Sequence, residues 1–381
     1  MRIGLNGQKL LIDKLAGPEI YTYNTFKALA ALDDDNYYTV YLEKEPAHKW
    51  WKELSNRNKN FSYKVVPKIL SWTQIGLASQ LFIDNQDLFF SATHTIPGIN
   101  LRKTKIISMI HGMEYKINNQ FHNNPIKKLI HPLILWWVLT FSNAIVVPSS
   151  ATKKAILKIK WPFFNKNKIM IIPEGVNKSF HKRSETEINK VKKKYKLDNK
   201  PYLIFVSTIQ PRKNIPIMVN AFSKFLEKHK KYNNHLLLIS GKLGWLYQDS
   251  LNAPKKYKIE NNVKFLGRTP DEDLPPLLSG AEGFISCSLE EGFGIPLLEA
   301  MACETPAIVS NIPAFKELGK NNVIYVNPKS VESIKTGIEN LLVKRKGNVL
   351  VKPAKSLASQ YTWEKGGNEL MSLFDRVFKN T

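Results

Sequence analysis

The chain has 381 residues, of which 43% are hydrophobic and 23% charged, so its composition excludes extended disorder and allows two domains with separate cores. Its two cysteines, Cys287 and Cys303, exclude a disulfide framework, and no cluster in the sequence has the ligand spacing of a structural zinc site. The formal net charge of +24 requires an explanation of its own.

The basic excess allows three explanations. Residues 151–200 hold 15 Lys and Arg against 4 Asp and Glu. Such a surface binds nucleic acid, binds anionic lipid headgroups, or only solvates a lysine-rich protein. We expect no nucleic-acid partner. Residues 127–138 (KKLIHPLILWWV) combine a basic flank with bulky apolar residues, which indicates either an interfacial membrane helix or a helix buried on the first domain's sheet.

Strand-like and helical segments alternate along the chain, which predicts parallel sheets covered by helices. In the first half the predicted strands are residues 2–6, 37–42, 61–66, 87–92, 104–110, 143–148 and 168–172. The polar segment 180–200 predicts a linker with a short helix. The second half predicts strands at 201–207, 235–240, 262–267, 282–287, 306–310 and 323–326, and helices at 215–229, 271–279, 295–303 and 330–343. A last helix is predicted over 362–378, with Thr362 as its N-cap.

This order predicts an α/β protein with two Rossmann-like, doubly wound domains that face a cleft, at residues 1–180 and 198–360. Ligands bind at the carboxyl ends of parallel strands in such sheets. The sequence runs from its first residues into a strand and has no signal peptide or apolar span of about 18 residues. We therefore expect a cytoplasmic protein, with peripheral attachment to the inner face of the membrane as a further expectation.

Glycine and histidine residues follow the predicted strands of the first domain. Gly17 opens a helix after the first strand, where a glycine either allows the backbone to approach a pyrophosphate or only makes a turn. His94 and His111 follow two later strands. An imidazole there can donate a hydrogen bond to a sugar hydroxyl or carry a proton, and a polar loop residue is the alternative. Residues 173–177 (PEGVN) predict a hinge.

Two cations follow the first strand of the second domain. Arg212 and Lys213 lie between that strand and the next predicted helix, where positive groups can contact a diphosphate. The alternative is an exposed basic loop. Residues 241–245 (GKLGW) follow the next strand, and Trp245 is interpreted as a packing residue.

Two carboxylates eight residues apart are the most informative pattern in the chain. Glu291 lies before a predicted helix that Pro296 suits at its first turn, and Glu299 lies about one turn into it. Gly292 and Gly294 place backbone without side chains at the positive end of this helix, which favours phosphate or sugar oxygens. A solvated loop and a surface helix are the alternative, but the apolar residues that follow favour a packed helix.

Residues 291–306 (EGFGIPLLEAMACETP) resemble the Glu-x7-Glu signature of retaining nucleotide-sugar glycosyltransferases of family 4, which have the GT-B fold. Residues 211–214 (PRKN) also match, and the pattern is similar to bacterial mannosyltransferase-like members. Several positions depart from the family. Glu304 and Ser207 replace glycines, Ala16 replaces the first glycine of the loop before Gly17, and Gly112 replaces an Asp.

The resemblance implies roles for these residues and domains. It makes 1–180 the acceptor-side domain, with a helix at about 365–381 crossing back onto it, and 198–360 the nucleotide-sugar domain. It implies that Glu299 holds the two ribose hydroxyls and that Glu291 contacts the donor hexose. The implied catalytic residues are His111, Glu291, Arg212 and Lys213. The implied donor-binding residues are Gly17, Arg212, Lys213, Glu291, Gly292, Phe293, Gly294 and Glu299, with His94 on the acceptor side.

The resemblance further implies transfer of a hexose to a saccharide or lipid-linked acceptor in cell-surface polysaccharide synthesis. Mannose from GDP-mannose is the first expectation for the donor, with no cofactor and no metal. A basic membrane- or polyanion-binding protein with a degenerate nucleotide-sugar site is the alternative. A GT-B epimerase or phosphorylase is a third, but the sequence contains no distinct signal for the cofactor lysine that a phosphorylase needs.

Overall fold

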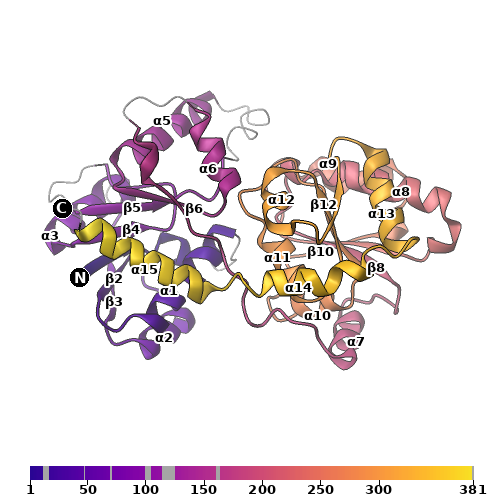
Figure 1. Cartoon of the computed structure of the whole chain (residues 1–381), viewed down its shortest axis with the longest axis horizontal. Helices are drawn as coiled ribbons and strands as arrows, with labels where there is room; N and C mark the ends of the chain where they lie inside the picture. The colour runs from indigo at the N-terminus through magenta and orange to yellow at the C-terminus, as the bar shows by residue number, and fades with distance from the viewer. Residues whose placement is uncertain are drawn as a thin grey trace. The chain divides into compact units, whose positions relative to one another are not determined.

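The computed structural model describes residues 1–11, 17–46, 48–68, 71–98, 104–113, 125–159 and 164–379. The chain divides into two compact units, shown in Figure 1. Unit 1 consists of Met1–Gly175 and Thr362–Thr381, and unit 2 consists of Val176–Tyr361. Each unit is built on one parallel sheet.

The sheet of unit 1 has seven parallel strands in the order β3-β2-β1-β4-β5-β6-β7. The strands are β1 (Arg2–Asn6), β2 (Tyr37–Leu42), β3 (Phe61–Val65), β4 (Leu88–Ser91), β5 (Lys105–Met109), β6 (Ala144–Val147) and β7 (Ile169–Ile171). Each strand predicted for the first half is confirmed to within one residue at each end. Near-continuous apolar runs made them easy to recognise, because strands buried on both faces carry such runs.

Helices cover both faces of this sheet, as the alternation of side chains in β5 illustrates. Ile107 and Met109 pack into one core with α1 and α15, whereas Ile106 packs into another with α5. The helices are α1 (Gly17–Leu32), α2 (His48–Arg57), α3 (Leu77–Asp84), α5 (Pro125–Phe141), α6 (Ser150–Leu157) and α15 (Trp363–Lys379). Short helical turns are Gln8–Leu11, Trp72–Gly76 and Lys166–Lys168.

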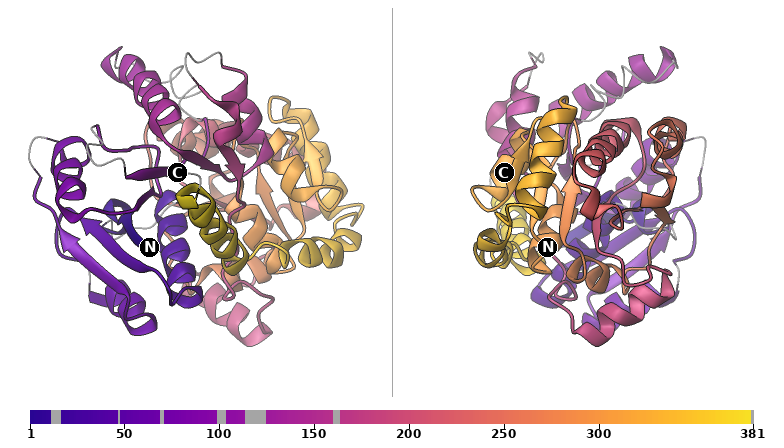
Figure 2. Two further views of the ribbon diagram at one scale, coloured as in Figure 1. Left: turned by 60° about the vertical axis from the view of Figure 1, so that its left-hand side comes forward. Right: turned by 90° about the vertical axis from the view of Figure 1, so that its right-hand side faces the viewer.

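The last helix belongs to the first unit. The α15 helix packs along α1, and the two lie side by side in Figures 1 and 2. Phe374 is fully buried, with its ring centroid 5.7 Å from that of Phe90 in β4. The backbone N–H of Lys365 donates to the Thr362 hydroxyl over 3.1 Å, which confirms Thr362 as the N-cap.

The sheet of unit 2 has six parallel strands in the order β10-β9-β8-β11-β12-β13. They are β8 (Tyr202–Val206), β9 (Leu236–Ser240), β10 (Val263–Gly267), β11 (Gly283–Ser286), β12 (Ala307–Ser310) and β13 (Ile324–Val326). The helices are α7 (Glu185–Lys194), α8 (Ile215–Lys228), α9 (Gln248–Lys256), α10 (Leu274–Ser279), α11 (Ile295–Ala302), α12 (Pro313–Gly319), α13 (Val331–Leu342) and α14 (Val351–Ala358). Short turns are Pro211–Lys213, Lys230–Tyr232, Glu260–Asn262 and Asn348–Leu350.

Both faces of the second sheet are covered as well. The α8 and α13 helices pack on one face, in a core that includes Phe222 and Ile338. The α11 helix contacts α10, α14 and strands β11 and β12. Seven of its eight residues are buried, which agrees with the packed helix expected from its apolar sequence.

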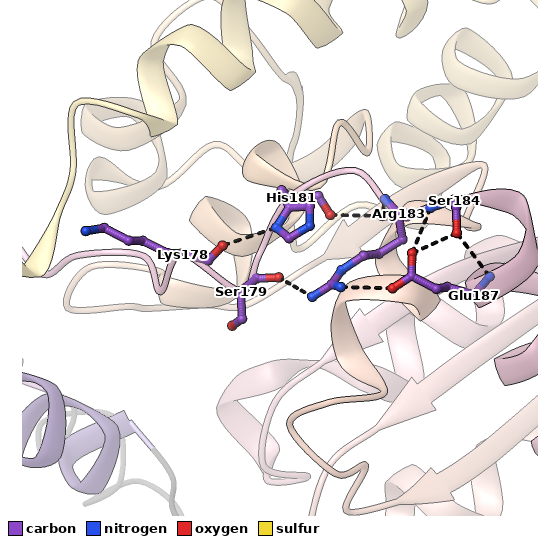
Figure 3. Close-up of polar contacts among 7 residues, drawn as sticks. Lys178, Ser179, His181, Arg183, Ser184 and Glu187 are labelled. Atoms are coloured by element: carbon purple, nitrogen blue, oxygen red, sulfur yellow. Dashed lines mark hydrogen bonds and ion pairs between the residues drawn. The ribbon is translucent and has the colours of Figure 1, made fainter. Parts of the chain in front are cut away.

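The segment predicted as a linker is instead part of unit 2, and Figure 3 shows the polar contacts around the start of its helix. Ser184 caps α7 in a capping box with Glu187, so both residues satisfy backbone N–H groups at the helix start. The Arg183 guanidinium donates to the Glu187 carboxylate over 2.9 Å and to the backbone oxygen of Ser179 over 2.7 Å. Ile188 is buried where α7 packs on α10. The short helix predicted within this segment is α7, whose apolar residues Ile188 and Val191 are buried.

The α5 helix packs partly into the core of unit 1, as one of the two interpretations of its sequence expects, and its contact with a membrane stays a prediction. Val138 and Leu139 are fully buried in the core of unit 1, whereas Leu133 is 56% exposed and Phe141 48% exposed. Within the described ranges, no helix has both the length and the apolar character that a membrane span requires.

Candidate functional site

Two buried cations follow β8 at the point where the strand order of unit 2 reverses. Strands β9 and β10 lie on one side of β8 and β11 lies on the other, and ligands bind at such a switch point. Arg212 and Lys213 occupy the short turn after β8. Asn214 follows in the left-handed conformation with φ 60°, which asparagine tolerates. Its side-chain amide donates to the backbone oxygens of Cys287 and Pro328 and so fixes the turn.

Both cations contact one carboxylate, that of Glu291, which follows the neighbouring strand β11. Lys213 Nζ lies 2.5 Å from Glu291 Oε1, and Arg212 Nη1 lies 2.9 Å from Oε2. The three side chains are only 6–12% exposed. Within this triad, two cations face one carboxylate, so one positive charge remains in excess. The alternative prediction for Arg212 and Lys213, an exposed basic loop, is therefore wrong.

The charge state of Glu291 follows from this environment. Burial alone would raise the pKa of its carboxyl group. The charges of Lys213 and Arg212 outweigh burial, and a hydrogen bond with Ser288 adds to their effect, so the pKa is lowered to about 2. Glu291 is therefore ionised at neutral pH.

The start of α11 depends on Gly294. This residue has φ 116° and precedes the helix, and its carbonyl oxygen accepts from the backbone N–H of Leu297 over 3.0 Å. A Cβ atom at Gly294 would lie 2.9 Å from the Phe315 ring. Both the backbone conformation and the close packing require glycine. Gly292 and Phe293, the other predicted donor-binding positions here, are buried beside it.

Glu299 lies in the second turn of α11 and is 8% exposed. Burial, and then the negative charge of Asp271, raise the pKa of its carboxyl group to about 8. Glu299 is therefore largely protonated at neutral pH.

Trp245 lies near the cationic turn as well. Its indole N–H donates to the side chain of Gln210, the residue before the turn, over 2.8 Å. This hydrogen bond agrees with the structural role expected for Trp245. Leu246 beside it has φ 48° and is 57% exposed.

In unit 1 the strand order reverses between β1 and β4, where Asn6 donates to the Ser91 hydroxyl over 3.1 Å. Gly17 is the first residue of α1 and is exposed, and a Cβ atom added to it would meet no other atom within 4 Å. Close packing in this structure therefore does not require glycine at position 17, and its role as a donor-binding residue stays a prediction. Ala16 lies outside the described residues.

His94 follows β4, and its side chain is exposed. Desolvation, and then the charges of His111, His131 and Lys9, lower its pKa below the ordinary value for histidine. His94 is therefore neutral. Its acceptor-side role stays a prediction.

His111 follows β5 and uses both ring nitrogens within unit 1. Nε2 lies 3.0 Å from the backbone oxygen of Ala92, and Nδ1 lies 3.3 Å from Glu174 Oε1. Tyr21 packs edge-on against the ring at 4.9 Å. From the sequence we expected only a hinge role for the segment that contains Glu174. Nothing in the sequence pointed directly to this contact, and a carboxylate placed where the chain leaves a domain is the one feature that could have suggested it.

No group of three or more His, Cys, Asp and Glu side chains in the described ranges is arranged to hold a metal ion. Cys287 and Cys303 are both buried and free. Burial raises the pKa of each thiol, so both behave as core residues.

Comparison with known proteins follows the division into two units. The model of Glycosyltransferase Family 4 matches residues 15–180, and that of Glycosyl transferases group 1 matches residues 187–356. The chain belongs to glycosyltransferase family 4. It is 32% identical to O-antigen chain mannosyltransferase B of Escherichia coli over 184 residues, and 28% identical to O-antigen chain mannosyltransferase RfbU of Salmonella typhimurium over 261 residues. These stretches cover 48% and 68% of this chain, but only 48% and 65% of the two relatives.

Solved structures match over the full length and confirm the GT-B fold. A sucrose-phosphate synthase from Thermosynechococcus elongatus has a TM-score of 0.78 at 17% identity and covers 100% of both chains. Anabaena HepE in complex with UDP-glucose also has a TM-score of 0.78, at 16% identity, and covers 99% of this chain and 100% of its own. At these identities the likeness establishes the fold alone.

Proposed function

We propose that this protein is a retaining hexosyltransferase that moves a hexose from a nucleotide diphosphate sugar to a saccharide or lipid-linked acceptor in cell-surface polysaccharide synthesis. The buried triad of Arg212, Lys213 and Glu291 carries this proposal. It lies where β8 and β11 end, at the reversal of the strand order. Unit 2 is then the donor-binding unit and unit 1 the acceptor side.

The triad suits a diphosphate leaving group. Negative charge grows on the diphosphate as the glycosidic bond breaks, and fixed cations stabilise that charge more in the transition state than in the ground state. Arg212 and Lys213 are fixed already, because Glu291 holds both of them. In the proposed reaction, the net positive charge of the triad faces the diphosphate. This role requires no metal ion, and we propose a metal-independent reaction.

Glu291 retains the capacity to bind the donor sugar. Its oxygens accept from Arg212, Lys213 and Ser288, yet an ionised carboxylate has about four lone-pair positions, so one remains. A hexose hydroxyl can therefore donate to Glu291 without displacing either cation. Gly292, Phe293 and Gly294 precede α11, and we propose that the backbone there contacts the donor as well.

Glu299 suits the ribose. One carboxylate can accept hydrogen bonds from both ribose hydroxyls, provided that it is ionised. Because burial keeps Glu299 largely protonated in the free protein, binding of the nucleoside would release a proton.

Mannose is the donor sugar we propose, with GDP-mannose as the first candidate. Support comes from the two relatives whose names describe them as O-antigen chain mannosyltransferases. We further propose that the protein works in the cytoplasm at the inner face of the membrane, where the exposed Leu133 and Phe141 of α5 would contact lipid.

Transfer assays with a panel of nucleotide sugars test the proposal. Purified protein should hydrolyse or transfer from one donor, with GDP-mannose expected to be preferred. The substitutions Lys213→Ala and Glu299→Ala should each lower kcat/KM by about 100- to 1,000-fold. Lys224→Ala removes an exposed lysine of α8 and is the matched control. Unchanged turnover in either site variant would overturn the assignment.

A nucleotide panel in a thermal-shift assay separates this proposal from the polyanion-binding alternative. A ligand that binds the folded state raises the melting temperature by mass action. A donor-specific shift supports the transferase. Salt-sensitive binding to anionic vesicles without any nucleotide shift would favour the alternative.

A further inference from the structure

A buried carboxylate faces the histidine at the end of β5. Glu174 is 5% exposed and lies two residues before Val176, where unit 2 begins. Its Oε1 is 3.3 Å from His111 Nδ1. Gly112, the neighbour of His111, has no side chain, so the carboxylate at His111 comes from a segment 63 residues further along the chain.

The two contacts of the ring restrict where its protons lie. A backbone carbonyl can only accept a hydrogen bond, so His111 Nε2 must carry a proton that it donates to the oxygen of Ala92. The contact between Nδ1 and Glu174 also needs one proton, carried by the ring or by the carboxyl group, because two lone pairs would otherwise face each other. A second ring proton on Nδ1 satisfies both contacts and makes the one to Glu174 a charge-assisted hydrogen bond.

The surroundings favour placing this charge on His111. Among the described residues, no Lys or Arg lies within ion-pair distance of Glu174, whereas Lys9 pairs with Glu19 at 3.3 Å. Tyr21 is neutral, because burial and the charge of Glu174 raise its pKa. His94 is neutral too, so among the described residues the ring that pairs with Glu174 and can carry the opposite charge is that of His111.

We propose that Glu174 is a positioning residue that holds His111 as a fixed imidazolium. Both ring N–H groups are then engaged, so His111 acts as a positive charge at the end of β5 and does not take a proton from the acceptor. The effect on sugar transfer rests on the proposed function. The charge state of the ring does not.

Nitrogen-15 NMR of the full-length protein with labelled histidine tests the charge state directly. The signals of His111 are assigned by their loss in His111→Asn. At neutral pH we expect both ring nitrogens of His111 to be protonated in the unsubstituted protein. In Glu174→Gln, whose amide can donate to Nδ1, we expect a neutral ring with its proton on Nε2. Glu19→Gln replaces another buried carboxylate of unit 1 and should leave the His111 signals unchanged.

Two results would overturn the proposal: a neutral His111 ring in the unsubstituted protein, or an unchanged imidazolium in Glu174→Gln. Neither depends on transferase activity, so the proposal fails separately from the proposed function. Where transfer is measured, Glu174→Gln should lower kcat by about 10- to 100-fold, and Glu174→Asp should restore part of it. Full activity with a neutral ring would refute a role in transfer.

Discussion

Glu291 and Glu299, eight residues apart around the start of α11, have opposite charge states at neutral pH. Two cations lower the pKa of Glu291 to about 2 although it is buried, whereas burial and Asp271 raise that of Glu299 to about 8. The same segment therefore presents an ionised carboxylate paired with cations and a protonated one ready to lose its proton. In the proposed reaction, the first faces the hexose and the second faces the ribose.

The raised pKa of Glu299 makes folding stability depend on pH. An unfolded Glu ionises near 4.5, so between about pH 4.5 and pH 8 the folded state binds more protons than the unfolded state. The contribution of Glu299 to stability is then lost as pH rises through this window. Glu299→Gln removes the effect, and relative to the unsubstituted protein it should gain about 1–3 kcal/mol between about pH 5 and pH 9. Urea unfolding measures this difference, with Glu272→Gln as the exposed control. A constant difference would contradict the assignment.

Ionisation of Glu299 should also make donor affinity depend on pH, but affinity should increase as pH rises, whereas stability decreases. Binding through ribose hydroxyls requires ionised Glu299, so affinity for a nucleotide diphosphate sugar should fall by about tenfold per pH unit below about pH 8. Calorimetric titration at several pH values measures the slope and the release of protons. Glu299→Gln should bind weakly at every pH. A steep slope that persists in this variant would assign the titration to another group.

The triad should show strong coupling between its members. Glu291→Gln leaves two buried cations without their carboxylate, at an expected cost of about 3–5 kcal/mol. Lys213→Met should cost less, because Arg212 still pairs with Glu291. Adding Lys213→Met to Glu291→Gln removes one of the opposed cations and should recover about 1–3 kcal/mol. Urea unfolding of the four proteins measures the cycle. Purely additive costs would mean that the pairs contribute little.

Glu304 has φ 60°, in the region where glycine is favoured, at the position where glycosyltransferases of this family usually have glycine. Its carboxylate contacts Lys355 of α14 at 2.7 Å, but the lysine side chain is 55% exposed and this pair contributes little. Glu304→Gly should therefore exceed Glu304→Ala in stability by about 1 kcal/mol. Thermal unfolding of both variants checks the order. The reverse order would show that the ion pair matters more than the backbone conformation.

Gly294 and Gly17 should respond differently to alanine. Gly294→Ala meets both a left-handed backbone and the Phe315 ring, so it should destabilise unit 2 by about 1–3 kcal/mol or more. Gly17→Ala has open space and should leave stability unchanged or slightly raised. If Gly17 contacts the donor as predicted, its alanine variant should still bind the donor more weakly. Unfolding and donor titration on both variants separate the two effects.

Much of this architecture could be predicted from the sequence, because buried parallel strands are near-continuous apolar runs. Three helices of unit 2 were missed for local reasons. Pro254 lies inside α9, Pro353 lies inside α14, and α12 is only seven residues long, so each segment resembled a loop.

The site was predictable in part. The spacing of Glu291 and Glu299 located one on a loop and the other in a helix, as found. Their pKa values depend on neighbours from other segments, such as Lys213 and Asp271, and could not be predicted. The contact between Glu174 and His111 was missed for the same reason, since 63 residues separate them.

The place of α15 in unit 1 has a consequence for how the protein is made. Phe374 and Leu370 complete the core formed by Ile3, Phe26 and Phe90, yet all of unit 2 lies between them in the chain. The ribosome therefore releases every residue of unit 2 before it releases the side chains that close the core of unit 1. During translation, unit 2 can therefore fold first, while the core of unit 1 still lacks α15 and exposes apolar side chains.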